Sequence, residues 1–209
     1  MTAKEKQTLY DRTLKRIKDL IAGEDDLIAV MATIVCELHG SLDYFDWTGF
    51  YRVVSPGLLK IGPYQGPPGC LQISFDRGVC GAAARTRTTQ LVPDVRQFPG
   101  YIACSGSTCS EIVVPVITPG GALIAVLDVD SDQLDAFNEV DKINLERVCV
   151  LVGAGIHSMY QEAMPFRFRQ TSSFGCSSLS SLLSRSRFRY FRCTPGFRTR
   201  TSKLPSRVP

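Results

Sequence analysis

Two cysteines and a glutamate stand together in front of a strongly apolar run. The stretch GYIACSGSTCSEIVVPV, residues 100–116, places Cys104 and Cys109 five residues apart, with Glu111 just before the run. A thiol on a loop that enters a buried strand can act as a nucleophile when neighbouring groups tune its pKa. This stretch therefore raises the question of whether its thiols are structural, metal-binding or catalytic.

Cys70 and Cys80 are further candidates because each adjoins a glycine, in PPGCLQI and RGVCGAA. Glycine lets a backbone approach a ligand closely. Cys80 is expected at the start of a short helix, where the helix dipole would lower the pKa of its thiol. The spacing of Cys70, Cys80 and Cys104 fits a redox trio and three ordinary buried thiols equally well.

The cysteine pattern does not predict a metal site. Neither this trio nor Cys109 forms a C-x-x-C pair, the spacing typical of zinc ligands. His39 and His157 are both expected on helices, as surface or capping residues. Cys36 and Cys149 lie within apolar helical stretches and are predicted to be core thiols.

Three acids and two aromatic residues could complete a pocket. In LDVDS, Asp128 and Asp130 are two residues apart and share one face of a strand, and Glu111 lies on the neighbouring strand. Like charges on one apolar face are unfavourable unless they bind something, so these acids suit a cation such as an amino acid's ammonium group. Strand-end acids that simply reach water are the alternative. Trp47 and Tyr51, in DWTGFY, share a face and could form an aromatic wall or ordinary core packing.

The elements that must position these residues follow an α+β pattern. Helical periodicity occurs at both ends of the first 160 residues, and strand-like runs with strong turns lie between. The hairpin around TPGG is the clearest of these turns. Helices are predicted over 1–22, 27–39, 77–86 and from Asn138 onward, and strands over 46–54, 58–65, 71–75, 89–95, 110–117 and 122–131.

Charge divides the chain into two parts. From Gln161 onward there are ten basic residues and one acid, whereas the residues before it hold 14 basic and 19 acidic residues, a formal charge of −5. We therefore expect a domain over 1–163 and a basic, Ser/Arg/Phe-rich tail over 164–209 that is disordered. Such a tail could bind nucleic acid or a membrane surface, but neither partner is required to explain the cysteines.

Targeting features are not expected. No apolar run reaches the roughly 18–20 residues that span a bilayer. The N-terminal stretch MTAKEKQTLYDR has no apolar core and carries acids, unlike a signal or transit peptide. The predicted location is therefore the cytoplasm, where the cysteines would be mostly reduced.

Several motifs together resemble the free methionine-(R)-sulfoxide reductases, which are built on a GAF domain. They are DWTGFY, IGPYQGPPGCLQI, RGVCG, FPGYIAC, SEIVVPV and VLDVDS, and the similarity runs in order from about residue 5 to 160. The resemblance implies a central six-stranded antiparallel sheet with helices packed on it, often in a homodimer. A GAF domain alone would say little about function. The functional signal is stronger here because the three cysteines, the aromatic pair and the acids all match the family's motifs at the same spacing.

The resemblance also implies roles for individual residues. Cys104 matches the nucleophile, Cys70 the principal resolving cysteine and Cys80 an auxiliary thiol, whereas Cys109 is not part of the motif. The aromatic pair matches residues that hold the methyl group of the substrate, and the three acids match those that bind its amino group and the sulfoxide. These substrate-binding positions are Trp47, Tyr51, Glu111, Asp128 and Asp130.

The implied reaction needs no cofactor, because its electrons pass through thiols. Cys104 would attack the sulfur of free L-methionine-(R)-S-oxide as the oxygen gains a proton, with Glu111 the favoured donor, and would become a sulfenic acid. Cys70 would condense with it to a disulfide that thioredoxin reduces. The alternative is a GAF sensor that binds a small ligand without catalysis. Such regulators usually adjoin an output domain, which this sequence does not suggest.

Overall fold

The computed structural model describes residues 1–104 and 106–155 of the chain. They all lie within the unit Met1–Arg167. The tail predicted over 164–209 and the predicted helical position of His157 lie outside the described residues.

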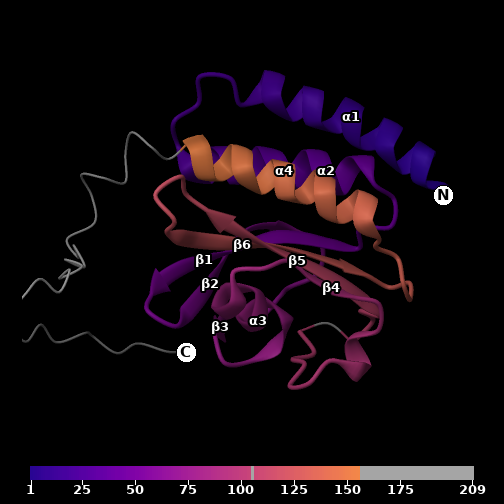
Figure 1. Cartoon of the computed structure of the whole chain (residues 1–209), viewed down its shortest axis with the longest axis vertical. Coiled ribbons are helices and arrows are strands. Elements are labelled where there is room, and N and C mark those ends of the chain that lie inside the picture. Colours follow the sequence, from indigo (N-terminus) through magenta and orange to yellow (C-terminus); the bar gives the residue numbers. More distant parts are fainter. Residues whose placement is uncertain (105, 156–209) are drawn as a thin grey trace, which may run out of the picture. The chain divides into compact units, whose positions relative to one another are not determined.

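The described residues form one six-stranded antiparallel sheet with helices on both faces (Figure 1). Its strand order is β3-β2-β1-β6-β5-β4. This confirms the predicted α+β class and the six-stranded sheet that the resemblance implied. The strands are β1 (Trp47–Ser55), β2 (Leu58–Gln65), β3 (Gln72–Ser74), β4 (Gln90–Val92), β5 (Ser110–Ile117) and β6 (Leu123–Ser131). The helices are α1 (Ala3–Leu20), α2 (Leu27–Ser41), α3 (Gly78–Thr86), the short 3-10 helix η1 (Val95–Gln97) and α4 (Glu139–Gly155).

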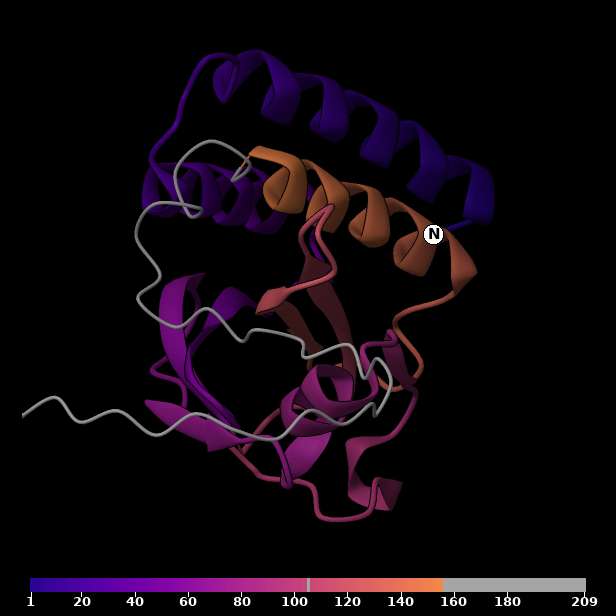
Figure 2. The same ribbon diagram turned by 60° about the vertical axis from the view of Figure 1, so that its left-hand side comes forward.

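Helices α2 and α4 cover one face of the sheet, and α1 packs on their outer side (Figures 1 and 2). Tyr10, Ile34 and Leu145 of these helices share a core with Phe50 of β1 and Leu127 of β6, and all five are fully buried. Full burial of such side chains contributes roughly 1.5–3 kcal/mol each. This core makes the sheet rigid enough to hold groups on its other face. None of the described helices combines the length and hydropathy that a bilayer-spanning helix needs.

Side-chain caps set where these helices begin. Thr2 and Glu5 form a capping box at the start of α1, and the Asp26 side chain accepts a hydrogen bond from the Ala29 amide of α2 at 2.8 Å. Asn138 caps α4 as predicted, since its Oδ1 accepts a hydrogen bond from the Val140 amide at 2.9 Å. Caps of this kind typically contribute about 1 kcal/mol of helix stability.

Asp141 fixes α1 to the start of α4. Its buried carboxylate accepts hydrogen bonds from Lys6 Nζ at 2.6 Å and from the hydroxyls of Tyr10 and Tyr44 at 3.0 and 2.5 Å. A buried ion pair is tolerated only when hydrogen bonds satisfy its remaining polar atoms, as they do here. The network therefore determines how the first helix docks.

The other face of the sheet is covered by α3 and by long loops, below the sheet in Figure 2. Helix α3 begins at Gly78, whose φ of +66° is readily adopted only by glycine. A Cβ at Gly81 would lie 2.5 Å from the carbonyl oxygen of Ser74, so glycine lets α3 pack against the end of β3. This close approach brings Cys80 over the sheet, where it is 3 % exposed.

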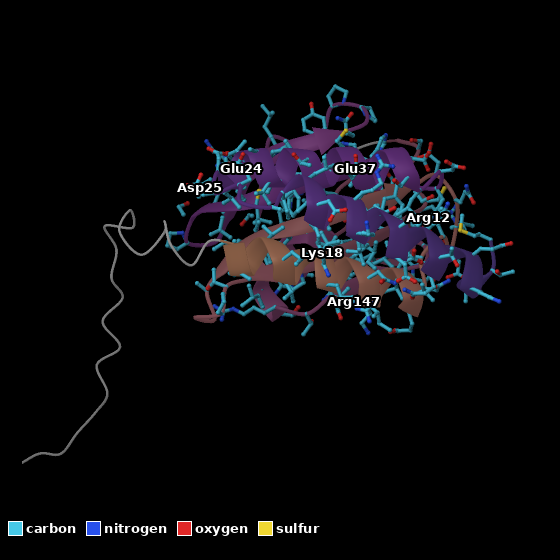
Figure 3. The ribbon with its side chains drawn as sticks, turned by 90° about the horizontal axis from the view of Figure 1, so that it is seen from above. Arg12, Lys18, Glu24, Asp25, Glu37 and Arg147 are labelled. Atoms are coloured by element: carbon cyan, nitrogen blue, oxygen red, sulfur yellow. A yellow bond between two sulfur atoms is a disulfide. The ribbon has the colours of Figure 1, made fainter. Side chains whose placement is uncertain are left out.

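The helical layer presents charged side chains outward, as Lys18 of α1 and Arg147 of α4 show (Figure 3). Cys36 of α2 is also exposed, so the prediction that it is a core thiol is wrong. It follows the buried Val35 by one residue, or about 100° around the helix, which turns it away from the core. Cys149 of α4 is buried, as predicted.

Candidate active site

A disulfide joins Cys70 to Cys104. Their Cα atoms are 5.3 Å apart although 34 positions separate them in sequence. Cys70 lies in the loop between β2 and β3, and Cys104 lies in the loop between η1 and β5. Cys80 and Cys109 remain thiols. The fold thus joins two of these four cysteines covalently, and Cys80 of α3 lines the same cavity as Cys104.

An aromatic stack lies beside this disulfide. The indole ring of Trp47 is stacked between the rings of Tyr51 and Tyr64, with centroid distances of 5.8 and 5.5 Å. Trp47 Nε1 donates a hydrogen bond to the carbonyl oxygen of Pro67 at 3.0 Å, which fixes the rotation of the ring. A Cβ at Gly49 would lie 2.5 Å from both Trp47 Cη2 and Tyr64 Cβ, so the missing side chain leaves room for the indole. The predicted shared face of Trp47 and Tyr51 is present, whereas Tyr64 was not anticipated.

The backbone before Cys70 packs against this stack. A Cβ at Gly69 would lie 3.1 Å from Tyr51 Oη and 3.2 Å from Trp47 Cζ2. Both distances are tighter than ordinary van der Waals contact, so glycine lets the chain pass close to the rings. Because Cys70 follows Gly69 directly, the aromatic stack and the disulfide are neighbours.

Three acids meet on the same face of the sheet. Glu111 of β5 pairs with Asp130 of β6, which pairs on its other side with Trp47 of β1. Asp128 pairs with Gly49, one step along the same face. Glu111 and Asp128 are 5 and 6 % exposed, and Asp130 is half-buried. The alternative that Asp128 and Asp130 are strand-end acids that simply reach water is wrong for Asp128, because it is buried.

Burial sets the protonation of these acids. Desolvation, followed by repulsion from Asp128 and Asp130, raises the pKa of Glu111 well above its usual range. Desolvation likewise raises the pKa of Asp130 far above its usual range, and the charge of Asp128 adds to the shift. Burial also raises the pKa of Asp128, but hydrogen bonds with Cys80 and Glu111 partly oppose this shift. The pKa of Asp128 is therefore only about 6. The shifts favour the protonated forms of Glu111 and Asp130, and Asp128 is the member of the trio that ionises most readily.

Cys80 does not have the lowered pKa that its helical position predicted. Burial raises the pKa of its thiol well above the usual range, and the charges of Asp128 and Glu111 add to the effect. The helix dipole acts over one turn and contributes about 1 kcal/mol, which does not offset complete desolvation beside acids. The sulfur of Cys80 and carboxylate oxygens of Glu111 and Asp128 lie within 4.8 Å of one another, and these residues could hold a metal ion.

A small cavity of about 20 Å³ lies between these groups. Its lining includes the three acids, Cys80 and Cys104, together with Tyr101 and Ile102 of the loop that carries Cys104. Such a volume accommodates one water molecule and no amino acid. The pKa of Tyr101 is raised to about 12 by burial and by the charges of Glu111 and Asp130. Sequence reasoning did not single out Tyr101, although it stands three residues before Cys104.

A larger surface groove of about 770 Å³ lies between α1 and α4. Its lining combines apolar residues such as Leu14 and Val150 with charged residues such as Lys15 and Arg147. It contains no cysteine. Thiol chemistry therefore belongs to the small cavity and not to the larger groove.

Comparisons with known proteins agree with this geometry. A family model described as GAF domain matches residues 22–157. The chain is 43 % identical over 147 residues to GAF domain-containing protein A of Dictyostelium discoideum, with 70 % of this chain and 92 % of that protein covered. It is 46 % identical over 109 residues to the free methionine-R-sulfoxide reductase of Saccharomyces cerevisiae, with 51 % of this chain and 61 % of that protein covered.

A solved structure with the same fold is the X-ray structure of the free methionine-R-sulfoxide reductase from Neisseria meningitidis in complex with its substrate. The two structures superpose with a TM-score of 0.71 at 37 % sequence identity. The match covers 75 % of this chain and 93 % of that chain.

Proposed function

The chain belongs to the GAF-domain family of free methionine-R-sulfoxide reductases, and we propose that it reduces free L-methionine-(R)-S-oxide to L-methionine. The observation that carries this proposal is the disulfide between Cys70 and Cys104 beside a cavity that three acids line. A disulfide of this kind is the product that a thiol reductase would leave after one turnover.

In the proposed first step, the thiolate of Cys104 attacks the sulfur of the sulfoxide. A bond between the two sulfurs forms while the sulfoxide oxygen takes up a proton. The resulting hydroxyl then transfers to the Cys104 sulfur, as its bond to the methionine sulfur and the bond between the two sulfurs both break, and methionine leaves with its sulfur reduced. Cys104 retains the oxygen as a sulfenic acid, so its sulfur is oxidised by two electrons. Glu111 is our choice of proton donor, since it is buried and its raised pKa favours the protonated form that can donate.

Asp128 and the aromatic stack would select the substrate. A carboxylate at Asp128 can pair with the ammonium group of a free amino acid, and Asp130 lies one step along the same face. The rings of Trp47 and Tyr51 provide an apolar wall for the methyl group on sulfur. A buried carboxylate that loses its cation is left unpaired, which disfavours substrates without a free amine.

In the second step, Cys70 condenses with the sulfenic acid of Cys104. The new bond between the two sulfurs forms as water leaves, and the pair reaches the disulfide state that the structure contains. A dithiol protein such as thioredoxin would then reduce the disulfide by thiol exchange. We assign Cys80 an auxiliary role, because its raised pKa keeps it a thiol. A reducing cytoplasm and a homodimer are parts of the same proposal.

One assay tests the proposal against a non-catalytic GAF sensor. The full chain is incubated with free methionine-(R)-sulfoxide, thioredoxin, thioredoxin reductase and NADPH, and released methionine is measured together with NADPH oxidation. We expect equal amounts of both over many turnovers. The Cys104→Ser variant is the control and should release none. Binding of the sulfoxide without any methionine release, by the reduced wild-type protein, would support the sensor instead.

A further inference from the structure

We propose that Cys80, Glu111 and Asp128 form a binding site for a single thiophilic divalent cation, with Zn²⁺ the best match. The three donor atoms lie within 4.8 Å of one another, and all three residues are buried. They come from three different elements, namely α3, β5 and β6, which the fold holds together independently of any ion. The cysteine spacing did not predict this site, because two of its ligands are acids that lie far from Cys80 in sequence.

A second observation points to a missing ligand at this position. Asp128 is 6 % exposed, and its Oδ1 has no hydrogen-bond partner among the described residues. A buried carboxylate oxygen without a partner is unfavourable, and Asp128 lines the cavity of about 20 Å³. That volume matches one ion or one water molecule. The orphaned oxygen and the cavity together favour a small cation.

The donor set selects the kind of cation. Mg²⁺ and Ca²⁺ prefer six or more oxygen ligands, whereas one sulfur and two carboxylate oxygens suit Zn²⁺. A tetrahedral Zn²⁺ would draw its ligand atoms to about 3.5 Å from one another, a modest contraction, and would leave a fourth position for water or Asp130. The protons of the Cys80 thiol and of the Glu111 carboxyl group would leave for the solvent as their bonds to zinc form, and no electrons are transferred.

The site is independent of the disulfide, because none of its three ligands is Cys70 or Cys104. The cation can therefore bind while that disulfide is intact. In the proposed function Asp128 binds the ammonium of the amino acid and Glu111 donates a proton to the sulfoxide. If that function holds, Zn²⁺ and methionine-(R)-sulfoxide compete, and zinc raises the KM of the reduced enzyme. This consequence alone depends on the proposed function.

The test uses the full oxidised chain and two metal probes. Zn²⁺ affinity and stoichiometry are measured by isothermal titration calorimetry, and Co²⁺ is added as a spectroscopic probe for sulfur-to-metal charge transfer. The variant is Cys80→Ser, and the matched control is Cys36→Ser, which removes an exposed thiol from α2. Cys176 and Cys193 are present in both proteins, so any contribution from them cancels. Circular dichroism checks that both variants are folded.

We expect wild type and Cys36→Ser to bind one Zn²⁺ with the same affinity and to give the charge-transfer band. Cys80→Ser should lose the band and bind Zn²⁺ at least about tenfold more weakly, since loss of even an outer-shell partner has that effect. Asp128→Asn should weaken binding similarly and serves if Cys80→Ser does not fold. Unchanged affinity and an unchanged band in Cys80→Ser would overturn the site. Zinc binding without reductase activity would reject only the proposed function, and activity without zinc binding only the cation site.

Discussion

Glu111 on β5 and Asp130 on β6 are direct cross-strand partners, and both carboxyl groups have a pKa well above the usual range. Asp128 lies two residues away on the same face, and burial raises its pKa to about 6. A sheet face built only for stability would carry apolar side chains at such positions. Under the proposed function, this arrangement lowers folding stability in exchange for groups that bind the substrate ammonium and donate a proton.

Replacing Glu111 with Gln should stabilise the protein and inactivate it. A folded-state pKa above the unfolded-state value makes stability fall as pH rises from about 4 through the folded pKa. Glutamine does not ionise, so the Glu111→Gln variant should not lose stability in this way as pH rises. Its unfolding free energy at pH 8 should exceed that of wild type by at least about 1 kcal/mol, because one pKa unit corresponds to about 1.4 kcal/mol.

Urea denaturation between pH 4 and pH 8 checks this prediction, alongside methionine release at pH 7. Activity should fall by on the order of 10²-fold or more, as is typical for loss of a general acid. Glu139→Gln is the matched control, because Glu139 is an exposed acid of α4. If both variants changed equally in unfolding free energy and in methionine release, burial of Glu111 would not be the cause of either effect.

The pH profile of kcat/KM should report the titration of Asp128. Below a pH of about 6 its carboxylate is protonated and no longer pairs with the substrate ammonium. We expect kcat/KM to fall about tenfold for each pH unit below that value, and to fall again at alkaline pH as Glu111 loses its proton. Measurements with a chelator present keep metal ions out of the site. An acidic limb that persists unchanged in Asp128→Asn would assign the titration to another group.

Free methionine-(R)-sulfoxide should be a much better substrate than its N-acetyl form. Acetylation converts the ammonium into a neutral amide, which leaves the buried carboxylate of Asp128 without its cation. The resulting loss in kcat/KM should be on the order of 10²-fold or more. A comparison of initial rates for the two compounds at matched thioredoxin concentration measures it. Similar values for both would show that the acids do not recognise the ammonium group.

Cys70→Ser should release one methionine per protein molecule and then stop. The attack by Cys104 precedes disulfide formation, so the chemical step survives while recycling by thioredoxin is lost. Rapid quenching with quantification of methionine gives the stoichiometry, and Cys36→Ser is the control that should turn over repeatedly. Sustained turnover by Cys70→Ser, with a disulfide to Cys80 found by mass mapping, would transfer the resolving role to Cys80.

Gly49→Ala should displace the indole of Trp47. The new Cβ would lie 2.5 Å from Trp47 Cη2, and overpacking of this size destabilises by about 1–3 kcal/mol. Trp47 is the single tryptophan of the chain, so its fluorescence reports the movement directly. We also expect KM to rise. Gly40→Ala is the matched control, since nothing lies within 4 Å of its Cβ position. A normal emission spectrum in Gly49→Ala would contradict the role given to Gly49.

The sequence predicted the elements well because each one has a strong local pattern. The turns SPG and TPGG fix two hairpins, and the apolar spacing of α1 and α2 gives one buried side to each helix. Alternation along β6 placed Asp128 and Asp130 on one face, as found. These features depend on neighbours in sequence, which is why they can be predicted from it.

Properties that depend on tertiary neighbours were missed. Cys36 was assigned to the core because it lies in an apolar stretch, although the apolar spacing of α2 leaves it outside the buried side of the helix. The pKa of Cys80 was predicted from its helix alone, whereas the acids that raise it come from β5 and β6. Tyr64 reaches the aromatic stack through the pairing of β2 with β1, across Gly49. Only the register of the sheet reveals that contact.

The disulfide between Cys70 and Cys104 also links the oxidation state of the protein to its resistance to unfolding and proteolysis. A crosslink that closes 34 positions of chain restricts the unfolded ensemble and stabilises the fold by about 4 kcal/mol. The oxidised protein is then the form that resists proteolysis, and the reduced protein unfolds more readily. Under the proposed function, a cell short of reducing power would accumulate the enzyme in a durable, inactive state. When reductant becomes available again, reduction of the disulfide would restore the active enzyme without new protein synthesis.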